Sequence, residues 1–162
     1  MTEQEIIGKG TWIDKLAYEV IKNEKEHPSI DGVIKVESGL GASGIPHIGS
    51  LGDAVRAYGV KLALENLGYK SKLIAYSDDM DGLRKIPEGF PEYLKEDMGK
   101  SVSAIDDPLC DKHDSYGEHM SSLLLEGLDK LGIKYVHRTA HDTYKNGILK
   151  EQIHKILVDW QP

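Results

Sequence analysis

The fold of this chain is decided by one glycine-dense stretch, Glu37-Ser-Gly-Leu-Gly-Ala-Ser-Gly-Ile-Pro-His-Ile-Gly-Ser-Leu-Gly-Asp53. A short apolar run, Val33–Val36, leads into it, and an amphipathic segment, Ile48–Leu67, follows it. A strand, a glycine turn and a helix N-terminus in this order favour phosphate binding, because backbone N–H groups point outward and the helix dipole attracts negative charge. A second apolar run, Ser71–Ser77, completes a parallel strand–helix–strand unit.

Apolar residues recur at helical or strand spacing on both sides of this unit. They predict three further helices and one further strand, over Thr11–Glu26, Ser115–Leu131, Thr143–Trp160 and Ile133–His137 respectively. Proline and glycine interrupt residues 82–114, so we expect a loop-rich insertion there, with a short helix near Glu92–Met98.

These elements predict the domain organisation of the chain. We expect residues 1–30 to form an N-terminal helical segment and residues 31–162 to form an α/β core that contains the insertion 82–114. The core is expected to be a three-layer, Rossmann-like parallel sheet that forms the first half of a doubly wound fold. Because such halves usually continue into a second half, we expect this chain to be the front part of a longer enzyme.

The composition excludes several classes of function. The chain has 162 residues, a formal net charge of −7 and a single cysteine. This acidity argues against a nucleic-acid clamp in this segment alone, but not against a nucleic-acid substrate held mainly by other parts of a longer protein. One cysteine cannot form an internal disulfide, and no apolar run approaches the roughly 18 residues of a membrane span. We therefore expect a cytoplasmic protein with no membrane contact.

The stretch contains a literal G-x-G-x-x-G, Gly39–Gly44, which suggests a dinucleotide site. Two features oppose that interpretation. Pro46 would break a helix that began inside the glycines, and the second strand ends near Asp78, well beyond the distance at which the fingerprint expects its acid. The alternative is that Pro46 is a turn residue and that the helix begins at His47-Ile-Gly49. His47 can then donate an N–H to a phosphate oxygen, and Gly49 leaves room for a flat base.

Two other groups of residues are candidates for chemistry. Asp78, Asp79 and Asp81 follow the second strand, at the edge where parallel sheets bind ligands, although a solvated acidic turn has the same composition. The other group gathers one cysteine, two histidines and several aspartates in the short segment Asp107–His119, and Zn²⁺ accepts such ligands tetrahedrally. Its sulfur and imidazole members are Cys110, His113 and His119. The alternative is a solvated loop in which His119 packs locally.

Three stretches together resemble the class I lysyl-tRNA synthetases, in the same order and at similar spacing. They are Gly41–Asp53, Tyr76–Pro87, and Asp107–Pro108 with His113–His119. Within the first, Pro46–Gly49 resembles the start of the His-Ile-Gly-His signature of class I aminoacyl-tRNA synthetases, with Ser50 in place of the last histidine. The similarity runs from about Gly32 to Trp160 and covers only the front of that family's catalytic domain.

The resemblance implies an activity and the residues that serve it. Members join lysine to ATP, which Mg²⁺ accompanies, as a lysyl-adenylate, and then transfer the lysyl group to the 3′-terminal ribose of tRNA(Lys). Mapped here, His47 and Gly49 would be the catalytic contacts to the ATP phosphates and adenine. Other positions would line the ATP and adenylate pocket: Ser38, Gly39, Ser43, Pro46 and Ser50.

The resemblance also implies roles for the two acidic groups. Asp78, Asp79 and Asp81 would contact the substrate, and one acid is needed for the lysine ammonium, without an indication of which. Some members carry zinc in the segment that corresponds to Asp107–His119, with Asp, Cys, His and His as ligands. The resemblance thus implies Asp107, Cys110, His113 and His119 as ligands here, and such a zinc would be structural because no position is left open. The family's Lys-Met-Ser-Lys-Ser loop and its anticodon-reading domain have no counterpart in this sequence. Two alternatives therefore stay open: a free-standing nucleotidyltransferase of the same superfamily and a non-catalytic ATP- or adenylate-binding module.

Overall fold

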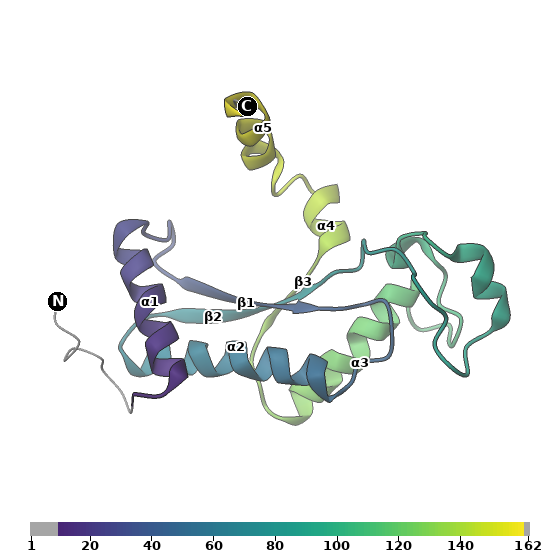
Figure 1. Cartoon of the computed structure of the whole chain (residues 1–162), viewed down its shortest axis with the longest axis horizontal. Helices are drawn as coiled ribbons and strands as arrows, with labels where there is room; N and C mark the ends of the chain where they lie inside the picture. The colour runs from purple at the N-terminus through teal and green to yellow at the C-terminus, as the bar shows by residue number, and fades with distance from the viewer. Residues whose placement is uncertain (1–9, 161–162) are drawn as a thin grey trace.

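A computed structural model describes residues 10–160 as a parallel three-stranded sheet with helices packed against it (Figure 1). The strands pair in the order β1-β2-β3. Their last residues, Leu40, Ser77 and Thr139, are in register, so the carboxyl ends of all three strands meet at one edge of the sheet. The α/β parallel fold is thereby confirmed. The strands span β1 (Ile34–Leu40), β2 (Ser71–Ser77) and β3 (Val136–Thr139).

Within residues 10–160, the structure has five α-helices and, in the insertion, two short 3₁₀ helices. In Figure 1, α2 and α3 run along one side of the sheet, whereas α4 and α5 project on the other. Helix α2 packs on β1 and β2, and α1 packs on α2, so an apolar core lies between α1, α2 and β1. The helices are α1 (Trp12–Glu26), α2 (Ile48–Asn66), α3 (Tyr116–Lys130), α4 (Ala140–Lys145), α5 (Lys150–Asp159), η2 (Glu92–Asp97) and η3 (Val102–Ala104).

The third predicted strand has different bounds in the structure. The third strand was predicted from Ile133 but begins at Val136, because the N–H of Ile133 donates to the Leu128 carbonyl and Gly132 takes a positive φ of 68°. These three residues close α3 with a C-terminal cap, and the buried Ile133 packs on Leu128. Ile133 therefore belongs to the helix end rather than to the strand.

The predicted helix over Thr143–Trp160 is wrong as a single element. The structure has two helices there, α4 and α5, separated at Gly147, whose φ is 66°. The first begins before Thr143, because the Thr139 hydroxyl accepts a hydrogen bond from the N–H of Asp142 at 3.0 Å and so caps α4. Apolar periodicity continued across the break and concealed it.

The insertion has a small core of its own, and this core reaches the glycine turn, which we define as residues 41–47 between β1 and α2. The Tyr116 hydroxyl donates to the Ser43 carbonyl at 3.2 Å, and Ala42 is buried against the insertion. The buried residues of this core are Ala42, Leu83, Leu94, Val102, Ile105, Tyr116 and Met120. The insertion and the glycine turn therefore form one packed unit. Within residues 10–160, every helix is too short or too polar to cross a membrane.

Candidate nucleotide and metal sites

His47 is the N-cap residue of α2. Its Nδ1 accepts hydrogen bonds from the N–H groups of Gly49 and Ser50, at 3.0 Å and 3.4 Å. A neutral imidazole that accepts at Nδ1 carries its proton on Nε2. The cap therefore fixes the tautomer in which Nε2–H is a donor, which is the form that a phosphate oxygen requires.

Gly49 is required by this cap. A Cβ added at Gly49 would lie 2.8 Å from Cε1 and 2.9 Å from Nδ1 of His47, closer than real Cβ contacts. The sequence suggested that Gly49 leaves space for a base, and the structure adds a reason that involves no ligand. The spacing His-x-Gly is the one that lets a histidine ring fold back onto the first turn of its own helix.

Ser50 completes the cap from the other side. Its Oγ accepts a hydrogen bond from the backbone N–H of His47 at 3.4 Å, so His47 and Ser50 form a reciprocal capping box. Ser50 stands where the resembled signature has its second histidine, and it keeps a local structural role. Helix α2 carries no acidic residue in its first turn, so its positive N-terminal dipole is not neutralised by its own side chains.

Some of the predicted nucleotide-binding residues share one cavity of about 600 Å³, and others do not. Ser43, His47 and Ser50 line it. Ser38 lies buried on β1, and its hydroxyl has no hydrogen-bond partner within residues 10–160. Gly39 and Pro46 are outside the lining, with Gly39 on β1 as part of a strand that is longer than predicted.

The three acids after β2 differ in burial and in their contacts. Asp79 is buried, and its Oδ1 accepts from the N–H of His141 at 2.9 Å, which ties the end of β2 to α4. Asp81 is exposed and pairs with Arg84 at 3.7 Å. Asp78 lies next to β1, where a Cβ added at Gly39 would be 3.2 Å from its Oδ2. Asp79 is therefore engaged in a structural hydrogen bond, whereas Asp78 faces Gly39 of β1, a residue that has no side chain.

Asp78 is also the acid whose environment disfavours its charge. Burial raises the pKa of the Asp78 carboxyl, and the neighbouring charges of Asp81 and Asp79 raise it further. No hydrogen-bond donor reaches its carboxylate within the described chain. A positive charge brought next to Asp78 would be attracted strongly, because its attraction would offset the repulsion from Asp79 and Asp81.

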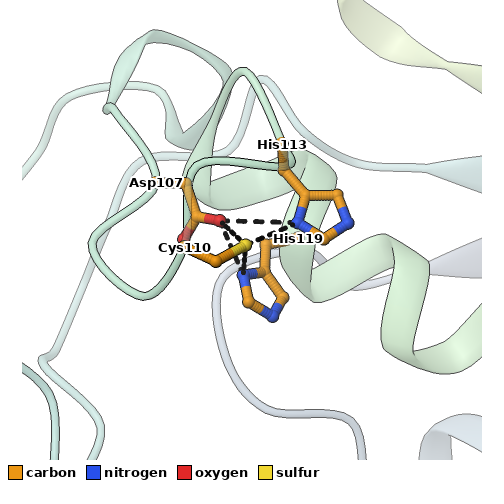
Figure 2. Close-up of side chains that lie close together, drawn as sticks. All are labelled: Asp107, Cys110, His113 and His119. Atoms are coloured by element: carbon orange, nitrogen blue, oxygen red, sulfur yellow. Dashed lines mark hydrogen bonds and ion pairs between the residues drawn. The ribbon is translucent and has the colours of Figure 1, made fainter.

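The four residues predicted as zinc ligands converge, as Figure 2 shows. The Cys110 Sγ lies 3.0 Å from Oδ2 of Asp107, 3.3 Å from Nδ1 of His113 and 3.7 Å from Nδ1 of His119. Oδ2 of Asp107 lies 2.7 Å from Nδ1 of His119 and 3.4 Å from Nδ1 of His113. His119 is on α3, whereas His113 precedes this helix.

Three of these five separations fit a tetrahedral zinc site, whereas Oδ2 of Asp107 lies at hydrogen-bond distance from His119 and Cys110, at 2.7 Å and 3.0 Å. Metal–ligand bonds of about 2.0–2.3 Å at tetrahedral angles place ligand atoms roughly 3.3–3.7 Å apart. All four candidate ligand atoms lie within 4.8 Å of one another, and one oxygen, one sulfur and two imidazole nitrogens form a donor set that zinc accepts. We refer to Asp107, Cys110, His113 and His119 as the four-residue cluster.

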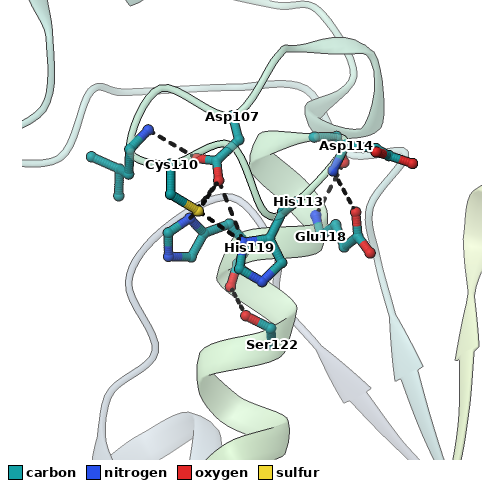
Figure 3. A network of polar contacts seen from close by, with 9 residues as sticks. Asp107, Cys110, His113, Asp114, Glu118, His119 and Ser122 are labelled. Carbon is teal, nitrogen blue, oxygen red and sulfur yellow. Dashed lines mark hydrogen bonds and ion pairs between the residues drawn. The ribbon is translucent and has the colours of Figure 1, made fainter.

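A second layer of hydrogen bonds holds the four-residue cluster in place, as Figure 3 shows. The N–H of Leu109 donates to Oδ1 of Asp107 at 3.0 Å, and the Ser122 hydroxyl donates to the carbonyl of His119 at 2.7 Å. Burial opposes the charge of Asp107, but hydrogen bonds from Cys110, Leu109 and His119 outweigh it, so the pKa of this carboxyl is lowered. The carboxylate is held ionised, as a metal ligand must be.

Sequence reasoning missed the two cations that line this cavity. Arg84 and Lys85, from the start of the insertion, line it together with the glycine turn. The signal was present, since two adjacent cations in a chain of net charge −7 stand between an apolar residue and Ile86-Pro87.

A parallel sheet whose first strand leads through a glycine turn to a histidine-capped helix has the architecture of a nucleotide-binding α/β protein. Comparison with known families narrows this class. Residues 10–161 match the family described as tRNA synthetases class I (K), and the chain belongs to this family.

Relatives agree with this placement. The chain is 65% identical over 155 residues to a lysine–tRNA ligase of Cenarchaeum symbiosum (strain A). The aligned residues make up 95% of this chain and 29% of the relative. It is 40% identical over 129 residues to a lysine–tRNA ligase of Rickettsia bellii (strain OSU 85-389), and here the aligned residues make up 78% of this chain and 24% of the relative. The chain thus spans less than a third of the length of these relatives.

Proposed function

We propose that this chain forms the nucleotide-binding part of an enzyme that activates lysine with ATP and transfers it to tRNA(Lys). Lysine, ATP with its Mg²⁺, and tRNA are the substrates, and the cytoplasm is the compartment, since charged tRNA supplies the ribosome. We retain residues 31–162 as the catalytic core with its insertion 82–114, preceded by the N-terminal helical segment. Contacts to tRNA are assigned mainly to regions outside this chain, which is acidic.

The observation that carries this proposal is the geometry of His47. Its ring caps α2 through Nδ1 and lines the cavity, so its Nε2–H is free for a phosphate oxygen. This donor gains strength as negative charge develops on the α-phosphate while the lysine carboxylate attacks it. Ser43 and Ser50 line the same cavity and supply neighbouring polar groups, while Gly49 acts by admitting the ring.

We assign the lysine ammonium to Asp78 among the three candidate acids. Asp79 is committed to the N–H of His141, and Asp81 is exposed beside Arg84. Asp78 is partly buried, without a donor, at the carboxyl end of β2 next to Gly39. An ammonium here would form the charge-assisted hydrogen bond that its surroundings lack.

Binding of non-hydrolysable aminoacyl-adenylate analogues tests the proposal. We expect the lysyl analogue to bind at least roughly 10-fold more tightly than the norleucyl analogue, which lacks only the ammonium. Asp78→Asn should remove this preference, whereas Asp81→Asn should retain it. Equal binding of the two analogues by the unsubstituted chain would contradict the assignment of lysine, and binding of neither would contradict the adenylate site.

We further propose that the four-residue cluster binds a structural zinc ion. All four positions of a tetrahedral ion would be taken by Asp107, Cys110, His113 and His119, so no position is left for a substrate. The ion would join the loop before α3 to the first turn of that helix. Tyr116 lies on the same first turn of α3, and its hydroxyl contacts the glycine turn. Zinc would therefore stabilise the proposed nucleotide site indirectly, through this contact.

A further inference from the structure

The segment that carries Arg84 and Lys85 is held rigidly on both sides. Before them, Leu83 is buried, its N–H donates to the Lys100 carbonyl at 2.9 Å and its carbonyl accepts from Gly99 at 2.8 Å. After them, Ile86 packs against the core of the insertion. The backbone that bears the two cations is therefore fixed relative to the glycine turn, although both side chains are exposed.

The two cations line the same cavity as the N-terminus of α2. This cavity of about 600 Å³ is lined by the glycine turn, His47 and Ser50 and by Arg84, Lys85 and Glu88 of the insertion. Two cations against one carboxylate give this cavity a positive lining in a chain whose net charge is −7. The dipole of α2 adds to it.

Neither cation is strongly engaged with another side chain. Arg84 pairs with Asp81 at 3.7 Å, and its side chain is 80% exposed, so the pair contributes little. Lys85 forms no ion pair within residues 10–160. Other exposed cations are held more closely by neighbours on their own helices: Arg56 pairs with Asp53 at 2.9 Å and Lys95 pairs with Glu92 at 3.1 Å.

We propose that Arg84 and Lys85 bind the β- and γ-phosphates of ATP in the cavity that His47 also lines. This inference rests on the proposed function, because it takes the cavity to be the ATP site. Guanidinium and ammonium groups form charge-assisted hydrogen bonds with phosphate oxygens, and the arginine fork can bind two oxygens at once. The pair would position the pyrophosphate that leaves when the carboxylate oxygen of lysine forms its bond to the α-phosphorus and the Pα–O bond to the β-phosphate breaks.

Calorimetric titration with ATP, AMP and inorganic pyrophosphate tests this inference. In the double variant Arg84→Gln/Lys85→Gln we expect ATP and pyrophosphate affinities to fall roughly 10- to 100-fold, with AMP affinity unchanged. The matched control is Arg56→Gln/Lys95→Gln, which removes the same charge from exposed positions outside the cavity. It should leave all three affinities within about 2-fold of the parent.

The outcomes separate this inference from the function on which it rests. Unchanged ATP and pyrophosphate affinities in the Arg84/Lys85 variant would overturn the inference and leave the adenylate site standing. An equal loss of affinity in the control would show that net charge causes the effect. A loss of AMP affinity in the Arg84/Lys85 variant would show that the two side chains maintain the shape of the cavity. Either result would overturn the inference. If neither ATP nor AMP binds the parent chain, the adenylate site itself is wrong and the inference falls with it.

Discussion

The glycine turn and the four-residue cluster are joined through one packed core, yet their polar groups are arranged in opposite ways. In the cluster, four side chains point at one another, and hydrogen bonds lower the pKa of Asp107. Around the glycine turn, polar groups point into a cavity, and Asp78 beyond the end of β2 has a raised pKa and no donor. The cluster satisfies its own charges, whereas the nucleotide region leaves donors and charges unsatisfied.

We infer from this difference that the four-residue cluster serves the structure and that the proposed nucleotide region receives ligands. A set of residues that satisfies itself fits a structural ion, because nothing is left to bind a substrate. A donor fixed by a helix cap, two loosely paired cations and an unpaired acid suit substrates that bring phosphate and ammonium groups. Changes in the cluster should therefore act mainly on stability, and changes in the nucleotide region mainly on binding.

The largest effect is expected from Cys110→Ala. Loss of one ligand should reduce bound zinc from about one per chain to about none after chelator washing, since zinc affinity depends on the complete ligand set. The melting temperature should fall by roughly 10 °C, the shift that about 3 kcal/mol produces in a chain of this size. Metal analysis and thermal unfolding measure both, with Asp111→Ala as a control next to the cluster. Stoichiometric metal in Cys110→Ala would refute the site.

A smaller effect on stability is expected from Gly49→Ala, compared with the same substitution at Gly52, which also lies near the start of α2. Gly49→Ala should cost about 1–2 kcal/mol, because the new Cβ displaces the His47 ring and breaks the cap. Gly52→Ala, on the same helix, meets no atom within 4 Å and should stabilise by up to about 1 kcal/mol. Urea unfolding gives both values. Similar effects at the two positions would show that the ring does not require a glycine.

The smallest effect is expected from Asp78→Asn, and it should be favourable. Because folding raises the pKa of Asp78, its stability contribution is complete below the ordinary aspartate pKa and is lost as the pH rises through the raised value. At neutral pH the variant should therefore be more stable than the parent, by less than about 1 kcal/mol, and the gain should vanish near about pH 3. Denaturant unfolding at the two pH values checks this, and a loss of stability at neutral pH would contradict it.

Apolar periodicity and turn residues predicted most of the helices and strands. Contacts between residues in the folded chain explain the elements that were predicted wrongly. The bounds of β2 followed from its apolar run alone, because a buried strand needs no partner information. The break between α4 and α5 could not be predicted, since Gly147 interrupts a pattern whose apolar periodicity continues. Ile133 was misplaced because a buried apolar residue after a helix fits a cap as well as a strand.

The candidate sites divide in the same way. The four-residue cluster was predictable, because zinc ligands are recognisable residue types gathered in one short segment. The different fates of Asp78, Asp79 and Asp81 were not, since they depend on the N–H of His141 and on Gly39, which are distant in sequence. The role that we propose for Arg84 and Lys85 needed the folded path of the insertion, which brings them to the same cavity as the glycine turn.

The central claim is that His47 has two separable roles, a cap through Nδ1 and a phosphate donor through Nε2. His47→Asn tests it most directly, because asparagine is a strong N-cap residue but offers no donor at the position of Nε2. ATP affinity measured by calorimetry should fall roughly 10-fold or more, while the melting temperature stays within about 2 °C of the parent. Unchanged affinity, or a loss of affinity explained by an equal loss of stability, would contradict the account.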